Sequence, residues 1–242
     1  MMRRILPVLI SSLLLLSAAA QRVPKANLFF RKGMELKGKN MLPEAMASFK
    51  SAIALNKNFD SAYTEMGKLH IALGNVDSAI TNFRKAVTIN PKMTEAHIAL
   101  GNIYRDARQN LDSAIKYFST AIKLDSTNKV TWYSMAWCYN AKEESEKAIP
   151  FAARALEIDN TYRPAYGELG HAFHKTKNFT AGLEQFKKNI AIPPPIDLPY
   201  FYSGLCYIEL KQKDGALKMY DELQKLNPKM AENLKKRIEK ME

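Results

Sequence analysis

The chain has few of the residues on which most enzymes and metal sites depend. Of its 242 residues, two are cysteine, two are tryptophan and four are histidine. The sequence contains no glycine-rich phosphate loop, no GxSxG and no HExxH motif, and no cysteine at a register that pairs it with a histidine. The sequence thus contains none of these catalytic motifs. We therefore expect a protein that is not an enzyme and that carries no cofactor.

Long apolar runs are also scarce, and the longest one lies at the N-terminus. Residues 1–20 read MMRRILPVLISSLLLLSAAA, in which two arginines precede an apolar core and a run of small residues. The core, Ile5 to Leu16, is shorter than the roughly 20 residues of a membrane-spanning helix, and this order is typical of a secretory signal peptide. The sequence predicts a periplasmic or secreted protein, cleaved after Ala20. The alternative is a membrane-tethered assembly factor that keeps this segment as an uncleaved anchor.

Positive charge is what the sequence has in excess. Lysine and arginine number 36 against 24 aspartate and glutamate residues, which gives a formal net charge of +12. The basic residues are spread along the whole chain, a distribution that favours solubility and self-repulsion rather than a nucleic-acid surface. We expect no nucleic-acid partner, and membrane contact only if the N-terminal segment is retained.

Small residues recur along the chain at a nearly constant interval. One series, with steps of 34, 34, 35, 34 and 34, is Gly33, Gly67, Gly101, Ala136, Gly170 and Gly204. A second, with steps of 34, 35, 34, 34 and 34, is Ala45, Ala79, Ala114, Ala148, Gly182 and Ala216. Aromatic residues follow the second series at Phe49, Phe83, Phe118, Phe186 and Tyr220, with Ala152 as the exception and Phe151 beside it as the expected substitute. Such a period indicates stacked helix pairs, and the two series together place one inserted residue between Asp106 and Leu111.

This pattern resembles the tetratricopeptide repeat, a helix–turn–helix unit of 34 residues, over about Ala26 to Pro228. The resemblance implies an all-α fold: an α-solenoid of six repeats plus a C-terminal capping helix. After the signal peptide at 1–20 and a short tail at 21–25, the six repeats are expected at about 26–59, 60–93, 94–128, 129–162, 163–196 and 197–228. The capping helix is expected at 229–242, where Met230, Leu234, Ile238 and Met241 form one apolar face. Open-ended repeat stacks require such a cap.

The resemblance also implies where a partner binds, because the first helices of the repeats line the binding groove of the family. In each repeat this groove stripe has three positions, which lie three residues before, one after and four after the small residue of the first helix. The stripe is unusually apolar in the C-terminal half of the chain. An exposed apolar patch marks an interaction site on a soluble protein, so we predict that a protein or peptide binds there. The predicted groove residues are Asn102, Arg105, Tyr133, Trp137, Asn140, His171, His174, Leu198, Phe201, Leu205 and Ile208. The alternatives are that the sixth repeat folds inward or that the N-terminal tail covers this patch.

Two other readings of these residues are weaker. One binding mode of the family clamps a C-terminal carboxylate, and Asn102 and Arg105 suit it, but Phe30 and Met34 stand where the first repeat should be polar. The pair His171 and His174 has the i, i+3 spacing of metal ligands but no evident third ligand, so no metal is predicted.

The two cysteines, Cys138 and Cys206, occupy comparable sites two repeats apart. This separation is too large for a disulfide, which needs Cα atoms within about 7 Å. We therefore expect two buried free thiols.

Overall fold

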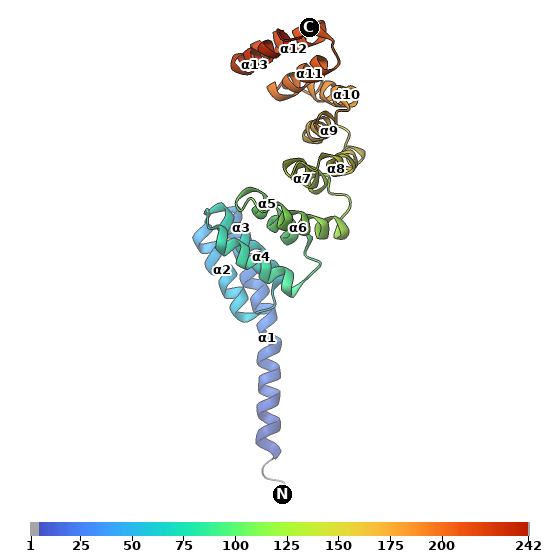
Figure 1. The fold of residues 1–242 in the computed structure, drawn as a ribbon. Coiled ribbons are helices and arrows are strands. Elements are labelled where there is room, and N and C mark those ends of the chain that lie inside the picture. The colour runs from blue at the N-terminus through green and yellow to red at the C-terminus, as the bar shows by residue number, and fades with distance from the viewer. Residues whose placement is uncertain (1–4, 242) are drawn as a thin grey trace. The chain divides into compact units, whose positions relative to one another are not determined.

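The computed structural model of the chain, drawn in Figure 1, describes the backbone of residues 5–241 and the side chains of residues 22–241. Within this part the chain forms thirteen α-helices and no strand, which confirms the all-α prediction. The helices are α1 (Ile5–Gly38), α2 (Leu42–Leu55), α3 (Asp60–Ala72), α4 (Val76–Ile89), α5 (Thr94–Asp106), α6 (Leu111–Leu124), α7 (Lys129–Ala141), α8 (Ser145–Ile158), α9 (Arg163–Lys175), α10 (Phe179–Ile190), α11 (Asp197–Glu209), α12 (Lys213–Leu226) and α13 (Pro228–Ile238).

The predicted signal segment, residues 1–20, lies outside the part of the chain whose side chains are described, and Met1 to Arg4 lie outside it altogether. Among the described residues, no helix combines the length and the apolar character that crossing a membrane requires.

The turn inside each helix pair contains one residue with left-handed backbone. These residues are Asn40 (φ 58°), Gly74 (φ 73°), Gln109 (φ 49°), Glu143 (φ 61°), Lys177 (φ 61°) and Lys211 (φ 57°). They recur at the period of the repeats, except for one longer step. The longer step runs from Gly74 to Gln109 and arises in the α5–α6 turn. There α6 begins five residues after the end of α5 at Asp106, whereas α4 begins four residues after the end of α3 at Ala72. The predicted insertion therefore lies in the α5–α6 turn.

The recurrent glycine allows the two helices of a pair to approach closely. A Cβ atom on Gly67 would lie 2.8 Å from the ring of the buried Phe83, and one on Gly170 would lie 2.6 Å from the ring of Phe186. A phenylalanine from the second helix therefore fills the space that the missing side chain leaves.

The fourth pair solves the same packing problem differently. Ala136 carries the Cβ that the glycines lack, and Ala152 stands where the other pairs have a ring, so this pair departs from the pattern at both positions. Phe151 supplies the missing bulk, with its ring centroid 5.3 Å from that of Tyr139 and 5.9 Å from that of Trp132. The expected substitution of Phe151 for the recurrent aromatic residue is confirmed.

The chain divides into two compact units, Met1–Arg108 and Gln109–Glu242, and the division falls within the α5–α6 turn. The first unit holds α1 to α5, and its core includes Phe49, Met66 and Leu69. The second unit holds α6 to α13. Its hydrophobic clusters follow the chain from α7–α9, through α10–α11, to α11–α13.

The last helix, α13, packs on α11 and α12 and closes the C-terminal end of the second unit. Leu234 is fully buried, and its Cδ2 atom would lie 2.5 Å from a Cβ atom placed on Gly204. Leu234 thus takes the place that a phenylalanine ring has in other pairs. Ile238 is buried beside it, and Met230 and Met241 pack against the same cluster. The predicted capping helix is confirmed.

Candidate functional site

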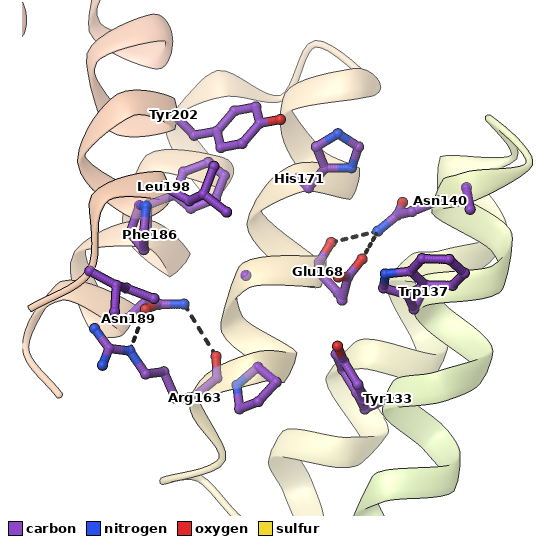
Figure 2. Close-up of a pocket in the computed structure, with 15 residues that line it drawn as sticks. Tyr133, Trp137, Asn140, Arg163, Glu168, His171, Phe186, Asn189, Leu198 and Tyr202 are labelled. Carbon is purple, nitrogen blue, oxygen red and sulfur yellow. Dashed lines mark hydrogen bonds between the residues drawn. The ribbon is translucent and has the colours of Figure 1, made fainter. Parts of the chain in front are cut away.

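The second unit contains a pocket of about 550 Å³ on the face formed by its first helices, shown in Figure 2. We call it the α7–α11 pocket. Its lining residues are Tyr133, Trp137, Asn140 and Ala141 from α7; Arg163, Pro164, Gly167, Glu168 and His171 from α9; Phe186 and Asn189 from α10; Ile196 directly before α11; and Leu198, Pro199 and Tyr202 from α11. The first helices of three successive repeats, α7, α9 and α11, therefore supply most of the lining, and the second helix α10 supplies two residues.

Aromatic side chains form the walls of this pocket and are held by ring contacts. The Tyr133 ring meets Tyr162 edge to face, with centroids 5.7 Å apart. On the other side, Tyr202 stacks on Phe186 at 5.5 Å and meets His171 edge to face at 5.5 Å. Rings fixed in this way offer apolar contact area that costs little conformational entropy on binding.

Asn140 and Glu168 contribute the polar part of the pocket between α7 and α9. Asn140 is buried, and its Nδ2 atom donates to Glu168 Oε2 at 2.8 Å and to the Glu168 backbone carbonyl at 3.0 Å (Figure 2). The Oδ1 atom of Asn140 is buried without a hydrogen-bond partner. Burial raises the pKa of the Glu168 carboxyl, and the bond from Asn140 opposes this only in part. This end of the pocket therefore presents hydrogen-bond acceptors.

Arg163 and Asn189 form a second polar pair between α9 and α10. Arg163 Nε donates to Asn189 Oδ1 at 3.0 Å, and Asn189 Nδ2 donates back to the Arg163 carbonyl at 3.2 Å (Figure 2). Arg163 Nη1 donates to the carbonyl of Pro194 in the proline-rich link before α11. Arg163 Nη2 is buried without a hydrogen-bond partner, so this end carries an unused donor.

His174 lies beside the pocket and contacts a buried cysteine. Its Nδ1 atom is 3.6 Å from Cys206 Sγ, so the expectation that no cysteine pairs with a histidine is wrong. Sequence spacing does not reveal the pair because it joins neighbouring repeats. Burial raises the pKa of the Cys206 thiol to about 12, so the group stays protonated and is no nucleophile at neutral pH. Both Cys138 and Cys206 are buried free thiols, as predicted.

In residues 22–241, no group of three or more histidine, cysteine, aspartate or glutamate side chains is arranged to hold a metal ion. His171 and His174 have aromatic neighbours instead: each ring meets Tyr202, and His174 also meets Phe179.

Ten of the eleven predicted groove residues fall into three groups in the structure, and the eleventh, His174, contacts Cys206 beside the pocket. Tyr133, Trp137, Asn140, His171 and Leu198 line the α7–α11 pocket. Phe201, Leu205 and Ile208 are half-buried and pack against the cluster that contains Leu234 of α13. Asn102 and Arg105 belong to α5 in the other unit, where Arg105 Nε donates to Asp106 Oδ1 at 2.6 Å.

Sequence reasoning missed Glu168, Arg163, Asn189 and Tyr202 as pocket residues. A signal for Glu168 was present, because it stands two residues before Gly170 as Glu65 stands two residues before Gly67. The other three lie off the stripe that the resemblance singles out.

A stack of helix pairs with a preformed pocket on its first helices defines a class of repeat scaffold that binds other proteins. Family models described as tetratricopeptide repeat match residues 64–129, 130–162 and 200–229, together more than half of the chain. The chain therefore belongs to the tetratricopeptide repeat family. None of the matched models describes an enzyme.

The curated relatives are longer proteins. The chain is 26% identical over 199 residues to anaphase-promoting complex subunit 3 of Schizosaccharomyces pombe, covering 82% of this chain and 30% of that protein. It is 24% identical over 200 residues to BBSome complex member BBS4 of Bos taurus, covering 78% of this chain and 36% of that protein. The chain thus spans about a third of the length of these relatives.

Solved structures share the fold. YrrB, described as a tetratricopeptide repeat protein with an unusual peptide-binding site, superimposes with a TM-score of 0.71 at 22% identity, covering 78% of this chain and 97% of its own. PilW, described as a type IV pilus biogenesis factor, gives a TM-score of 0.68 at 18% identity, covering 86% and 97%. At such identities the likeness shows the fold alone.

Proposed function

We propose that this chain is a non-catalytic interaction scaffold that binds a segment of a partner protein, or a peptide, in the α7–α11 pocket. The observation that carries the proposal is a preformed aromatic pocket with two buried polar atoms, Asn140 Oδ1 and Arg163 Nη2, that lack a hydrogen-bond partner. Buried polar atoms in folded proteins are nearly always paired. A polypeptide segment offers both an N–H donor and a C=O acceptor at every residue other than proline, so it complements both atoms.

The size and rim of the pocket support the same proposal. A volume of about 550 Å³ lies within the range of roughly 300–1,000 Å³ for ligand sites. Leu198 and Ile196 at the rim are 51% and 41% exposed, so an occupant buries apolar surface that otherwise faces water. Trp137 at the wall belongs to the residue type that most often dominates binding energy, at about 2 kcal/mol or more when central.

The double variant Trp137→Ala with Leu198→Ala tests the proposal. We expect this variant to lose capture of its crosslinked partner and to keep its helical content and melting temperature. Leu198 is a better choice than Phe201, because Phe201 packs against the cluster under α13. The matched control is Ile71→Ala with Leu73→Ala, which removes two exposed apolar side chains from the first unit. Undiminished capture by the pocket variant would rule out this binding site.

The relatives agree with a role in protein assembly, because those named above include a subunit of the anaphase-promoting complex and a member of the BBSome complex.

For this chain we propose a partner in the periplasm or outside the cell. Its support is the signal-like order of residues 1–20. Sequencing the N-terminus of the protein from its native host tests this. A chain that begins at Gln21 supports export, whereas Met1 in the membrane fraction supports the tethered alternative.

A further inference from the structure

Two of the six repeats carry the same glutamate on the first-helix face. Glu65 and Glu168 each stand two residues before the recurrent glycine of their repeats, Gly67 and Gly170. In both repeats the first helix of the preceding pair supplies a side chain that donates to this glutamate: Lys37 to Glu65 and Asn140 to Glu168. Lys37 and Asn140 also occupy one repeat position, four residues after the small residue. The chain thus contains two copies of one arrangement.

The copy at Glu65 is neutralised within the chain. Glu65 is 7% exposed, and its carboxylate accepts from Lys37 Nζ at 2.5 Å and from Lys68 Nζ at 2.7 Å. Burial acts to raise the pKa of Glu65, but the hydrogen bonds and charges of the two lysines hold it below the usual value. A buried carboxylate at this repeat position is therefore stable when lysine ammonium groups surround it.

The copy at Glu168 has neutral groups where the lysines stand. Asn140 takes the position of Lys37, and His171 takes the position of Lys68. Burial lowers the pKa of His171, with help from Lys175 and His174, so this imidazole is neutral at pH 7. Among the described residues, the amide of Asn140 is the one side chain that donates to Glu168. The second copy keeps the carboxylate, which is half-buried here, and lacks the cations.

The surroundings of Glu168 suit a cation that comes from outside the chain. Figure 2 shows Glu168 between Trp137 and Tyr133 on one side and His171 and Tyr202 on the other. Aromatic faces attract cations electrostatically, most strongly where water is excluded. The buried Oδ1 of Asn140 is a second acceptor beside the carboxylate. A donor that carries positive charge satisfies both groups.

We propose that the α7–α11 pocket binds a lysine side chain of the partner segment, with its ammonium group between Glu168 and Asn140 and its apolar stem along Trp137 and Tyr133. This inference rests on the proposed function and specifies what the pocket selects. The net charge of +12 repels cationic segments at long range. The partner segment is accordingly a neutral or acidic one that carries a single lysine.

Two blocked peptides that differ in one group test the inference. They are acetyl-Ala-Ala-Lys-Ala-Ala-amide and the same peptide with norleucine, which keeps the apolar stem and lacks the ammonium group. Binding to the full chain is followed by the NMR signal of the Trp137 indole N–H. We expect the lysine peptide to bind about tenfold more tightly than the norleucine peptide, as fits a partly desolvated charge contact.

Three variants test whether Glu168 and Asn140 produce the preference for the lysine peptide. Glu168→Gln keeps an acceptor for Asn140 and removes the charge, so it should bind both peptides equally. Asn140→Lys rebuilds the arrangement of Lys37 and Glu65 inside the chain, so it should exclude the lysine peptide. Glu65→Gln changes the equivalent glutamate in the other unit and should leave the preference unchanged. Melting temperatures show that each variant is folded.

The outcomes separate the inference from the proposed function. Equal binding of both peptides by the parent chain, or a lysine preference that survives Glu168→Gln, overturns the lysine assignment and leaves the pocket as a peptide site. If neither peptide shifts the Trp137 signal, both the lysine assignment and the pocket as a peptide site are wrong. A tenfold preference lost in Glu168→Gln and kept in Glu65→Gln establishes the inference.

Discussion

At the scale of single residues, the turns inside the helix pairs store backbone strain in a regular way. Left-handed backbone disfavours most residues with a Cβ atom by roughly 1–2 kcal/mol. Among the six turn residues Gly74 avoids this cost, and Asn40 is of a type that tolerates the conformation. The turns persist because they satisfy the last carbonyls of the first helix. In the fifth pair, for example, Lys177 N donates to His174 O at 3.1 Å and Asn178 N donates to Phe173 O at 2.8 Å.

Replacing the exposed residues Glu143 and Lys177 with glycine should stabilise the protein. Each change relieves left-handed strain and leaves the backbone hydrogen bonds in place, so we expect a gain of about 0.5–1 kcal/mol per site in the free energy of unfolding. Urea unfolding at constant m-value measures it. Gly74→Ala is the control and should lower stability by a similar amount. A loss of stability in Lys177→Gly would show that the side chain, not the backbone, decides this position.

Glu168 gives a second prediction at this scale, about pH. Burial raises the pKa of its carboxyl above the usual 4.5, so the folded chain binds this proton more tightly than the unfolded chain does. Its contribution to stability is therefore fully present below 4.5 and is lost as pH rises through the raised folded value. Glu168→Gln removes this loss. We expect the variant to be more stable than the parent at pH 7, with a difference that shrinks as pH falls to 4.5 in parallel denaturation series. A parent that is the more stable chain at pH 7 would contradict this account.

At the scale of elements, α13 stabilises the C-terminal end of the second unit. It presents Ala231, Leu234 and Ile238 to the second unit and leaves its lysines in water. Leu234→Ala opens a cavity at Gly204 and should cost about 2–4 kcal/mol, measured by thermal or urea unfolding. Lys236→Ala, on the exposed side of the same helix, is the matched control and should change little. Equal effects of the two variants would mean that α13 does not cap the stack.

Most elements could be predicted because their determinants lie within one repeat. The recurrent small residues and aromatic residues, such as Gly67 and Phe83, stand 16 residues apart in one helix pair, so their period reports the packing directly. The inserted residue in the α5–α6 turn could be located because both series of small residues contain one step of 35 residues. The substitution of Phe151 for the ring that Ala152 lacks also follows from local spacing.

The pocket could be predicted only in part, because its polar contacts join residues of different helices that are far apart in the sequence. Asn140 and Glu168 are 28 residues apart, and Arg163 and Asn189 are 26 apart. The groove stripe of the family names Asn140 but not its acceptor. Phe201 was expected in the groove, but how far it packs towards α13 depends on the placement of that helix, which an apolar face alone does not specify.

At the scale of the whole molecule, the division into two compact units falls where the sequence departs from its period. The α5–α6 turn holds the inserted residue, and Ala107, Arg108, Gln109 and Asn110 are all exposed. Each other turn inside a helix pair is one residue shorter. The boundary between the units is therefore also the longest of these turns, and all four of its residues are exposed.

Limited proteolysis should cut the native chain first at this turn. Exposed turns that are longer than their neighbours open with little loss of packing, so trypsin is expected to cleave after Arg108 and give two fragments. Mass spectrometry of an early time course identifies the cut. Deleting Gln109 restores the regular turn length and should slow this cleavage. Earlier cleavage at a lysine in another turn would contradict the expectation.

The burial of Gly204 under Leu234 also has a consequence for self-association. In a repeat stack the surface that accepts the next helix is the same for a helix of the same chain and for one of another copy. A chain without α13 would present that surface permanently, and head-to-tail contacts of this kind form open filaments where the rotation between copies does not close a ring. By covering this surface, α13 prevents copies of a periodic protein from adding to one another end to end.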